Sequence, residues 1–378
     1  MIHVISDGQV RSFGNTDTLT YNLYMSGKWD DLIGEGEAAI KSGIDYKFLR
    51  QRMGYACFMK GDYFKASAHL EKALGYDTFD QFTIEYLWLS YLYSGKEAYA
   101  GTLEKSMFPD LRKRLSVRKF IPISSAVIEY NYKFSGSGFR SNGQYFRAGL
   151  GSKIGYRAYL DQSFSAYSQS VSVNFTDSSP FFTIKQPEYY AGLRFNVADK
   201  LILGTAYHYI NTHLGNSTFN GHLFLLGIAH ELNRFLFEAN LSVFRYAGTS
   251  TWQPELQAGY IFPGRSSFYM KGSVAAVLSP GESNIVISPE TGFRLFKGLW
   301  LEGHAAFGRM NFYNDYNGLY VYNGYDPMIM RMGAGMTYYL NERLAIWLVY
   351  STEKKEYYNY SSNTYNQFSY LGGLKLKI

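Results

Sequence analysis

Five histidines lie in the second half of the chain, where polar and apolar residues alternate. They are His208, His213, His222, His230 and His304. A histidine activates a serine nucleophile when a hydrogen bond joins the two side chains and an acidic group orients the ring. His208 and Ser242 would face the same side of the alternating segments, but the sequence shows no acid that would orient the ring. We therefore expect no catalytic residues and a chain that is not an enzyme.

Acidic and amide side chains crowd one tyrosine-rich segment near the C-terminus. The residues concerned are Asn314, Asp315, Asn317, Asn323 and Asp326. Their oxygen atoms are ligands that suit calcium, but Asp and Asn more often form turns. The single Cys57 excludes a disulfide within the chain and suggests no redox centre. We expect no metal site and no cofactor.

The composition of the 378-residue chain narrows the fold class. Aromatic residues make up 18% and charged residues only 18%, which is below the charged share of an average soluble domain. No apolar run is long enough for a membrane-spanning helix, so only a closed barrel of strands could cross a membrane. The net charge of +6 is mild, and the basic residues are spread along the chain, so we expect no nucleic-acid partner.

A repeat occupies the first third of the chain. Gly27, Gly61 and Gly95 are separated by 34 residues each, and small residues recur between them where two helices would cross closely. The residues expected to pack the helices are Gly27, Gly54, Gly61, Ala66, Ala73, Gly95 and Ala100. This pattern resembles the tetratricopeptide (TPR) repeat over residues 16–110. The resemblance implies a concave surface that binds other proteins; the alternative is that these helices only cap a barrel mouth.

Beyond a basic stretch at residues 112–119, the helical period gives way to a period of two. From Ile128 to Phe134 the polar residues share one face and the aromatic residues the other, and the same alternation returns many times. These segments are longer than the strands of a soluble sandwich and match tilted strands that cross a bilayer. A soluble β protein, with the aromatic residues as its core, is the alternative.

The connections between these segments are expected to alternate between tight turns and longer loops, as in outer-membrane barrels. We predict fourteen strands, with twelve or sixteen as alternatives. Their ranges are 124–136, 143–153, 155–168, 185–198, 200–213, 218–232, 234–248, 251–262, 265–279, 283–296, 298–312, 327–341, 343–357 and 364–378. The sequence therefore predicts an α plus transmembrane β chain: TPR-like helical hairpins, then a closed antiparallel up-and-down β-barrel of about 14 strands. Its parts are an N-terminal extension (1–15), a periplasmic helical domain (16–110), a linker (111–123) and the barrel (124–378).

The polar face of the strands should line the lumen. The charged residues assigned to it are Glu129, Arg147, Arg157, Arg194, Glu238, Glu255, Glu290, Arg294, Glu302 and Arg331. Basic residues predominate on the early strands and acidic ones later, which would set a field across a pore. Alternatively, Arg and Glu pair across the interior and close it, because an unpaired buried charge is costly. We favour the closed or narrow lumen.

Helical repeats joined to such a barrel resemble outer-membrane exporters of polysaccharide, and the Tyr/Asn-rich loops look like those of Bacteroidota barrels. The resemblance implies an outer-membrane protein with its N-terminal domain in the periplasm, and we assume that a signal peptide has been removed. We expect a non-enzymatic barrel subunit whose helices recruit periplasmic or outer-membrane proteins to a secretion, assembly or export complex, and whose barrel contacts outer-membrane lipid. The alternatives are a pore for polysaccharide or small solutes and, with less support, a lipid-modifying enzyme with His208 or His304 at the rim.

Overall fold

The chain divides into two units, residues 1–118 and 119–378, and each is described by itself. The computed structural model describes residues 12–94, 96–172, 180–198, 200–232, 234–262, 268–296, 298–341, 343–358 and 360–378. Structural statements below concern these residues, and Gly95 therefore lies outside them.

The first unit consists of helices joined by short turns. The helices are α1 (Phe13–Met25), α2 (Trp29–Lys41), α3 (Lys47–Met59), α4 (Tyr63–Tyr76), α5 (Gln81–Tyr93), α6 (Glu97–Leu103) and α7 (Pro109–Arg114). The first six form three successive hairpins, and α7 spans the predicted boundary between the helical domain and the linker. No described helix is both long enough and apolar enough to cross a membrane.

Two of the repeated glycines end helices. Gly27 follows α1 with φ +66°, and Gly61 follows α3 with φ +71°. The left-handed region is accessible to glycine at little cost, so each residue lets the backbone reverse into the next helix. The amide of Lys28 donates to the carbonyl of Leu23, and the amide of Asp62 donates to that of Cys57. Both turns are therefore closed by hydrogen bonds back to the helix they end.

Gly54 has a different role, at the crossing of α3 and α4. A Cβ atom added at Gly54 would lie 2.6 Å from Cγ of Leu70, so any larger residue would displace this buried leucine side chain. The small residues Ala66, Ala73 and Ala100 are all fully buried. The hairpins are thus held at close range by residues without long side chains.

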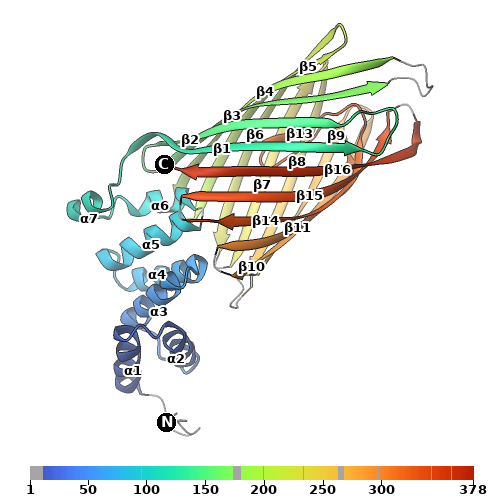
Figure 1. Ribbon diagram of the computed structural model, residues 1–378. Coiled ribbons are helices and arrows are strands. Elements are labelled where there is room, and N and C mark those ends of the chain that lie inside the picture. The colour runs from blue at the N-terminus through green and yellow to red at the C-terminus, as the bar shows by residue number, and fades with distance from the viewer. Residues whose placement is uncertain are drawn as a thin grey trace. The chain divides into compact units, whose positions relative to one another are not determined.

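The second unit is a closed antiparallel barrel of fourteen strands (Figure 1). The strands are β1 (Phe120–Ser135), β2 (Gly143–Ile154), β3 (Ala158–Ser172), β4 (Phe181–Ala198), β5 (Leu201–Leu214), β6 (Ser217–Leu232), β7 (Phe235–Tyr246), β8 (Thr249–Ile261), β9 (Tyr269–Ser279), β10 (Glu282–Phe296), β11 (Leu299–Met310), β14 (Met328–Tyr339), β15 (Leu344–Tyr357) and β16 (Tyr360–Lys377). Consecutive barrel strands are neighbours, and β1 pairs with β16 to close the ring, with Ser125 opposite Lys377. The predicted fold class and strand number are confirmed.

The two ends of the barrel differ. One end, here called the turn end, holds the start of β1, the end of β16 and short connections such as 155–157. The opposite end, the loop end, holds residues 136–142 and 311–327. The predicted alternation of tight turns with longer loops therefore holds only in part.

Three loop-end connections are two-residue turns. They are residues 215–216, 247–248 and 280–281. Ala247 and Gly248 both have positive φ, 49° and 82°. That combination is typical of the tight turn whose twist matches paired antiparallel strands.

Every barrel strand presents large apolar side chains on its outer face. One exposed example from each strand, in chain order, is Ile128, Phe146, Phe164, Phe195, Leu203, Leu226, Phe237, Leu256, Val274, Ile287, Phe307, Met332, Leu348 and Tyr370. An apolar ring of this extent would be costly in water and is the outer surface of a barrel that spans a membrane. A closed up-and-down barrel with such a surface is the architecture of the bacterial outer membrane, which places this chain there.

Candidate functional site

The long connection between β11 and β14 folds into the barrel. It forms a small hairpin of β12 (Tyr313–Asp315) and β13 (Tyr320–Tyr322), here called the inner hairpin, residues 311–327. Tyr313 is fully buried in an apolar cluster built from inward positions of the neighbouring strands. The other members of that cluster are Ala275, Val277, Val286, Ala306, Met310 and Met328. The lumen is therefore partly filled by the chain itself.

The tip of the inner hairpin reaches the opposite wall. Gly318, with φ +79°, is so close to β6 that an added Cβ would lie 2.7 Å from Cδ2 of Leu223. The carbonyl of Gly318 accepts a hydrogen bond from Nδ1 of His208 at 2.8 Å. A second apolar cluster packs against Phe312 and Val321; its members are Ala206, Ile210, Leu223, Leu225 and Phe244. Because β5 and β6 lie across the ring from β11 and β14, the inner hairpin crosses the lumen.

Amide side chains hold the first strand of the inner hairpin. Gln253 on β8 accepts a hydrogen bond from the amide of Asn314 at 2.9 Å and donates to its carbonyl at 2.8 Å. The side chain of Asn314 donates to Oγ of Ser242 at 2.7 Å. Gln253 and Asn314 are each only 2% exposed, so these bonds satisfy backbone groups that water does not reach.

Charged contacts hold the rest of the inner hairpin. Arg331 on β14 donates to Asp315 at 2.6 Å and also to the hydroxyl of Tyr322. The hydroxyl of Tyr320 donates to Glu129 at 2.8 Å, and Glu129 is paired with Arg147. Asp315, considered from the sequence as a calcium ligand, is therefore neutralised by an arginine.

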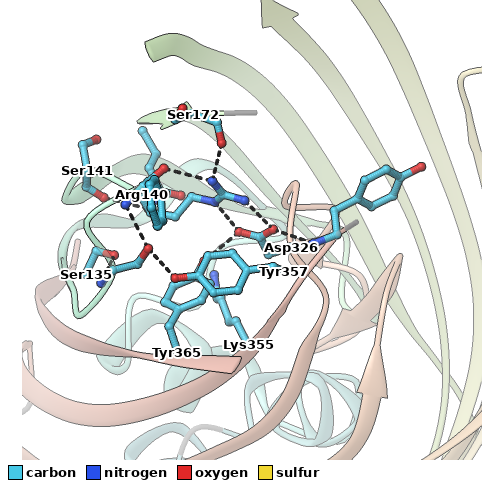
Figure 2. A network of polar contacts seen from close by, with 12 residues as sticks. Ser135, Arg140, Ser141, Ser172, Asp326, Lys355, Tyr357 and Tyr365 are labelled. Atoms are coloured by element: carbon cyan, nitrogen blue, oxygen red, sulfur yellow. Dashed lines mark hydrogen bonds and ion pairs between the residues drawn. The ribbon is translucent and has the colours of Figure 1, made fainter. Parts of the chain in front are cut away.

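Asp326 at the end of the inner hairpin forms a deeply buried ion pair with Arg140 from the connection between β1 and β2 (Figure 2). The side chains are 1% and 3% exposed. Nη2 of Arg140 donates to Asp326 at 2.9 Å, and Nη1 donates to the carbonyl of Ser172. The guanidinium also lies 5.4 Å from the ring centre of Tyr325 and 5.2 Å from that of Tyr357. We call the Arg140–Asp326 pair the latch, since it joins the inner hairpin to a second loop.

We expect Arg140→Ala to loosen the inner hairpin. Removing one partner of a buried ion pair leaves the other charge uncompensated, which costs about 3–5 kcal/mol. Purified variant in a planar bilayer should show transient conducting events that wild type lacks. Arg343→Ala, at an exposed position of the turn end, is the control and should behave like wild type. Identical silent traces for both variants would show that the latch does not hold the hairpin.

The ten charged residues assigned to the lumen mostly have partners on the same wall. Arg147 pairs with Glu129, Arg194 with Asp161 at 3.0 Å, and Glu290 with Lys271 at 2.8 Å. Three further carboxylates accept hydrogen bonds from neighbouring side chains: Glu302 from Tyr269, Glu238 from Asn240 and Glu255 from Gln253. Arg294 lies on the inner face of β10. Arg157 lies instead in the turn between β2 and β3 and donates to the carbonyl of Val197. These charged pairs therefore do not bridge the lumen. The segment that crosses it is the inner hairpin, which the sequence analysis did not predict.

The histidines considered for catalysis are held in structural contacts. His208 Nδ1 binds Gly318, and its Nε2 lies 3.3 Å from Glu188, while Ser242 is occupied by Asn314. His304 Nε2 is hydrogen-bonded to Ser351 at 3.1 Å, but no hydrogen bond or ion pair joins its ring to a carboxylate of a described residue. Within the described part of the chain, no group of three or more potential ligands is arranged for a metal ion.

A cavity of about 860 Å³ remains beside the inner hairpin. Charged and aromatic side chains share its lining, among them Glu129, Lys133, Tyr167, Arg331 and Glu353. Lys133 pairs with Glu353 at 2.6 Å, so these charges too are compensated within the wall. The cavity therefore offers polar contacts without a large excess of either charge.

The helical unit carries a second candidate site, a row of half-buried aromatic rings. The aromatic row consists of Tyr24, Trp29, Tyr55, Phe58, Tyr63, Phe82, Tyr86 and Tyr93. Ring centres of Tyr24 and Tyr55 are 5.4 Å apart, and those of Tyr55 and Tyr86 are 4.8 Å apart. These three residues come from α1, α3 and α5, so the row runs across all three helical hairpins.

The aromatic row contains no acidic or basic side chain. Burial and the nearby Tyr55 and Glu85 raise the pKa of Tyr86 to about 12. Burial raises the pKa of the single thiol, Cys57, to about 12 as well, so that Cys57 stays protonated and unreactive. The row combines apolar ring faces with neutral hydroxyls, the chemistry that is enriched where proteins bind one another.

No protein-family model matches the chain, and no curated protein matches it. Solved structures similar to it include a bacterial polysaccharide outer membrane secretin, the P. putida toluene transporter TodX and the Acinetobacter baumannii outer membrane protein Omp33. Their identities are 9%, 9% and 8%, and the TM-scores are 0.45, 0.46 and 0.40. Each match covers 68% of this chain, and respectively 99%, 91% and 99% of the other. A likeness of this degree concerns the barrel fold and says nothing of substrate or partner.

Proposed function

We propose that this chain is a non-enzymatic outer-membrane subunit whose barrel anchors it and whose helical unit recruits partner proteins in the periplasm. The aromatic row carries the proposal. Half-exposed aromatic side chains that touch in a continuous row are rarely left facing water and are typical of the energetic centres of protein interfaces. The TPR-type repeat suggested by the glycine spacing supports the same role, as part of a secretion, assembly or export complex.

The inner hairpin supports an anchoring role for the barrel over free passage of solutes. It crosses the lumen, and contacts with β1, β5, β8 and β14 hold it there. The path of the chain supports a periplasmic helical unit, because β1 begins at the turn end and short turns face the periplasm in outer-membrane barrels.

Capture from envelope extracts tests this proposal. Full-length protein on a resin should retain specific envelope proteins, and a variant that begins at Lys119 should not. Heat-modifiable electrophoretic mobility of both samples would show that the barrel is folded in each. Equal capture by the two proteins, or none by the full chain, would overturn the recruiting role.

A pore for small solutes or polysaccharide is the second candidate, and the 860 Å³ cavity beside the inner hairpin favours it. Single-channel conductance separates the two functions. The anchoring role predicts a silent bilayer for wild type, whereas steady conductance would favour transport. The non-enzymatic assignment predicts no phospholipid turnover by the purified protein, and turnover lost in His304→Ala would contradict it.

A further inference from the structure

Four basic side chains gather on the outer face of the barrel at its loop end. They are Lys185 on β4, His213 on β5, His222 on β6 and Arg245 on β7, and we call them the outer basic patch. Register places Lys185 opposite His213, and His222 opposite Arg245. These strands are consecutive in the ring (Figure 1), so the four side chains share one stretch of wall. No acidic residue occupies the outward positions 183–189, 207–213, 218–224 and 243–245 of these strands.

The inward neighbours of the patch show that it faces away from the lumen. Ile184 is 6% exposed and lines the cavity, and Thr212 donates to Gln186 inside the barrel. Phe244 is 1% exposed and packs with Phe312 of the inner hairpin. Because side chains alternate along a strand, Lys185, His213 and Arg245 point outward.

The basic groups of the patch are not used in ion pairs within the described part of the protein. His213 bonds to the hydroxyl of Thr218 at 3.1 Å, and His222 to that of Tyr207 at 2.9 Å. Lys185 and Arg245 are exposed and lie in no ion pair with a described residue. By contrast Arg140, at the same end of the barrel, is paired with a carboxylate.

The depth of the patch matches the headgroup region of a membrane. Toward the turn end, the same outward faces continue into Tyr189, Tyr207, Phe224 and Leu241. His222 is two residues from Phe224, and Arg245 is four from Leu241, which is about 7–13 Å along a strand. Tyrosines at this level are typical of the interface, and the basic groups lie just beyond them.

We propose that the outer basic patch binds the phosphate groups of a phosphorylated lipid in the leaflet at the loop end. Lys185 with His213 and His222 with Arg245 form two basic pairs on separate strand pairs, and Asn211 lies opposite Asn220 between them. Arg and Lys bind phosphate through charge-assisted hydrogen bonds, and the amides would bind polar headgroup atoms. A lipid with two phosphates could engage both pairs at once. The inference rests on the membrane-spanning barrel and is independent of what the helical unit binds.

Binding of diphosphoryl lipid A to the folded full-length protein in detergent micelles tests this site, with phosphatidylcholine as the neutral comparison. The test variant is Lys185→Gln/Arg245→Gln. The control is Arg234→Gln/Arg343→Gln, which removes the same charge from exposed positions at the turn end. We expect the test variant to bind lipid A about thirtyfold more weakly than wild type, from about 1 kcal/mol per basic side chain near a charged headgroup. The control should bind within about twofold of wild type.

Three results would overturn the lipid site. They are equal weakening in test and control variants, wild-type binding of phosphatidylcholine as strong as that of lipid A, and displacement of lipid A by millimolar inorganic phosphate at constant ionic strength. The last would indicate a site for free anions. Heat-modifiable mobility of every variant confirms that its barrel is folded, so weaker binding reports on the patch.

Discussion

Replacing residues 312–325 by a short Gly/Ser linker should turn a silent barrel into a conducting one. In the described structure the inner hairpin is the segment that crosses the lumen, from β11 and β14 to the wall that contains His208. A barrel of fourteen strands without it is close in size to porins, whose lumens are water-filled channels, so conductance should rise at least about tenfold above wild type. Planar-bilayer recording of the purified variant measures this directly.

The matched control keeps the inner hairpin and changes a side chain that does not hold it. Arg343 is exposed at the turn end and does not touch the inner hairpin, so Arg343→Ser should leave the conductance as it is in wild type. The hairpin variant should also lose its heat-modifiable mobility at a lower temperature. Removal of Tyr313 and its neighbours exposes inward Leu223 and Val277, at about 1.5–3 kcal/mol for each large apolar side chain. A folded hairpin variant that remains silent would show that something else blocks the lumen.

The barrel could be predicted from the sequence because its signal is repeated in every strand. Alternation such as that of Ile128 to Phe134 fixes which face of a strand meets lipid, and a shift by one residue would reverse all the side chains. Strand ends were less accurate, because two-residue turns such as Ala247–Gly248 leave no polar loop to mark them. The helical hairpins were visible through Gly27 and Gly61, whose positive φ ends a helix in each case.

The inner hairpin could not be predicted, because period-two alternation says nothing about what fills a barrel. One feature of the sequence did indicate that part of the barrel wall is covered from the inside. The run from Leu223 to Ala229 on β6 is apolar on both faces, which is typical of a strand buried on both sides. Leu223 and Leu225 point inward and are covered by the inner hairpin, while Phe224 and Leu226 face outward. The tyrosines and asparagines of residues 313–326 suggested an exposed loop, but their polar atoms bond to Gln253, Arg331 and other wall residues instead.

The aromatic row was missed for a related reason. The repeat was recognised through small residues that pack the helices together. A binding surface consists instead of residues that remain exposed once the helices have packed. Tyr24 and Phe58, and likewise Trp29 and Tyr63, are separated by 34 residues, the same spacing as the repeated glycines, and this spacing could have revealed the row. Such spacing places equivalent residues on successive hairpins of a repeat array.

Tyr55→Ala/Tyr86→Ala in the full-length chain should abolish capture of the envelope proteins that wild type retains. Tyr55 contacts the rings of Tyr24, Trp29, Phe82 and Tyr86, so it lies at the centre of the row. Truncation of a central aromatic residue at an interface costs about 2 kcal/mol or more, so the double variant should bind at least about thirtyfold more weakly. Titration of the captured partner against immobilised protein measures the loss. Tyr76→Ala, on α4 and 55% exposed outside the row, is the control and should bind as wild type does.

A second pair of substitutions separates recognition by the row from mere support of the fold. Tyr55→Phe/Tyr86→Phe keeps the ring faces and removes two hydroxyls, so stacking recognition should leave affinity within about threefold of wild type. Circular dichroism should show the same helix content in the Ala and Phe variants, because all eight rings are only half-buried and the core of the hairpins consists of residues such as Leu49 and Leu70. Loss of binding in the Ala variant with retained helices and rescue in the Phe variant would identify the aromatic faces as the recognition surface. Unchanged binding in both would place the partner elsewhere on the chain, and loss of helices in the Ala variant would assign the row to the core of the fold.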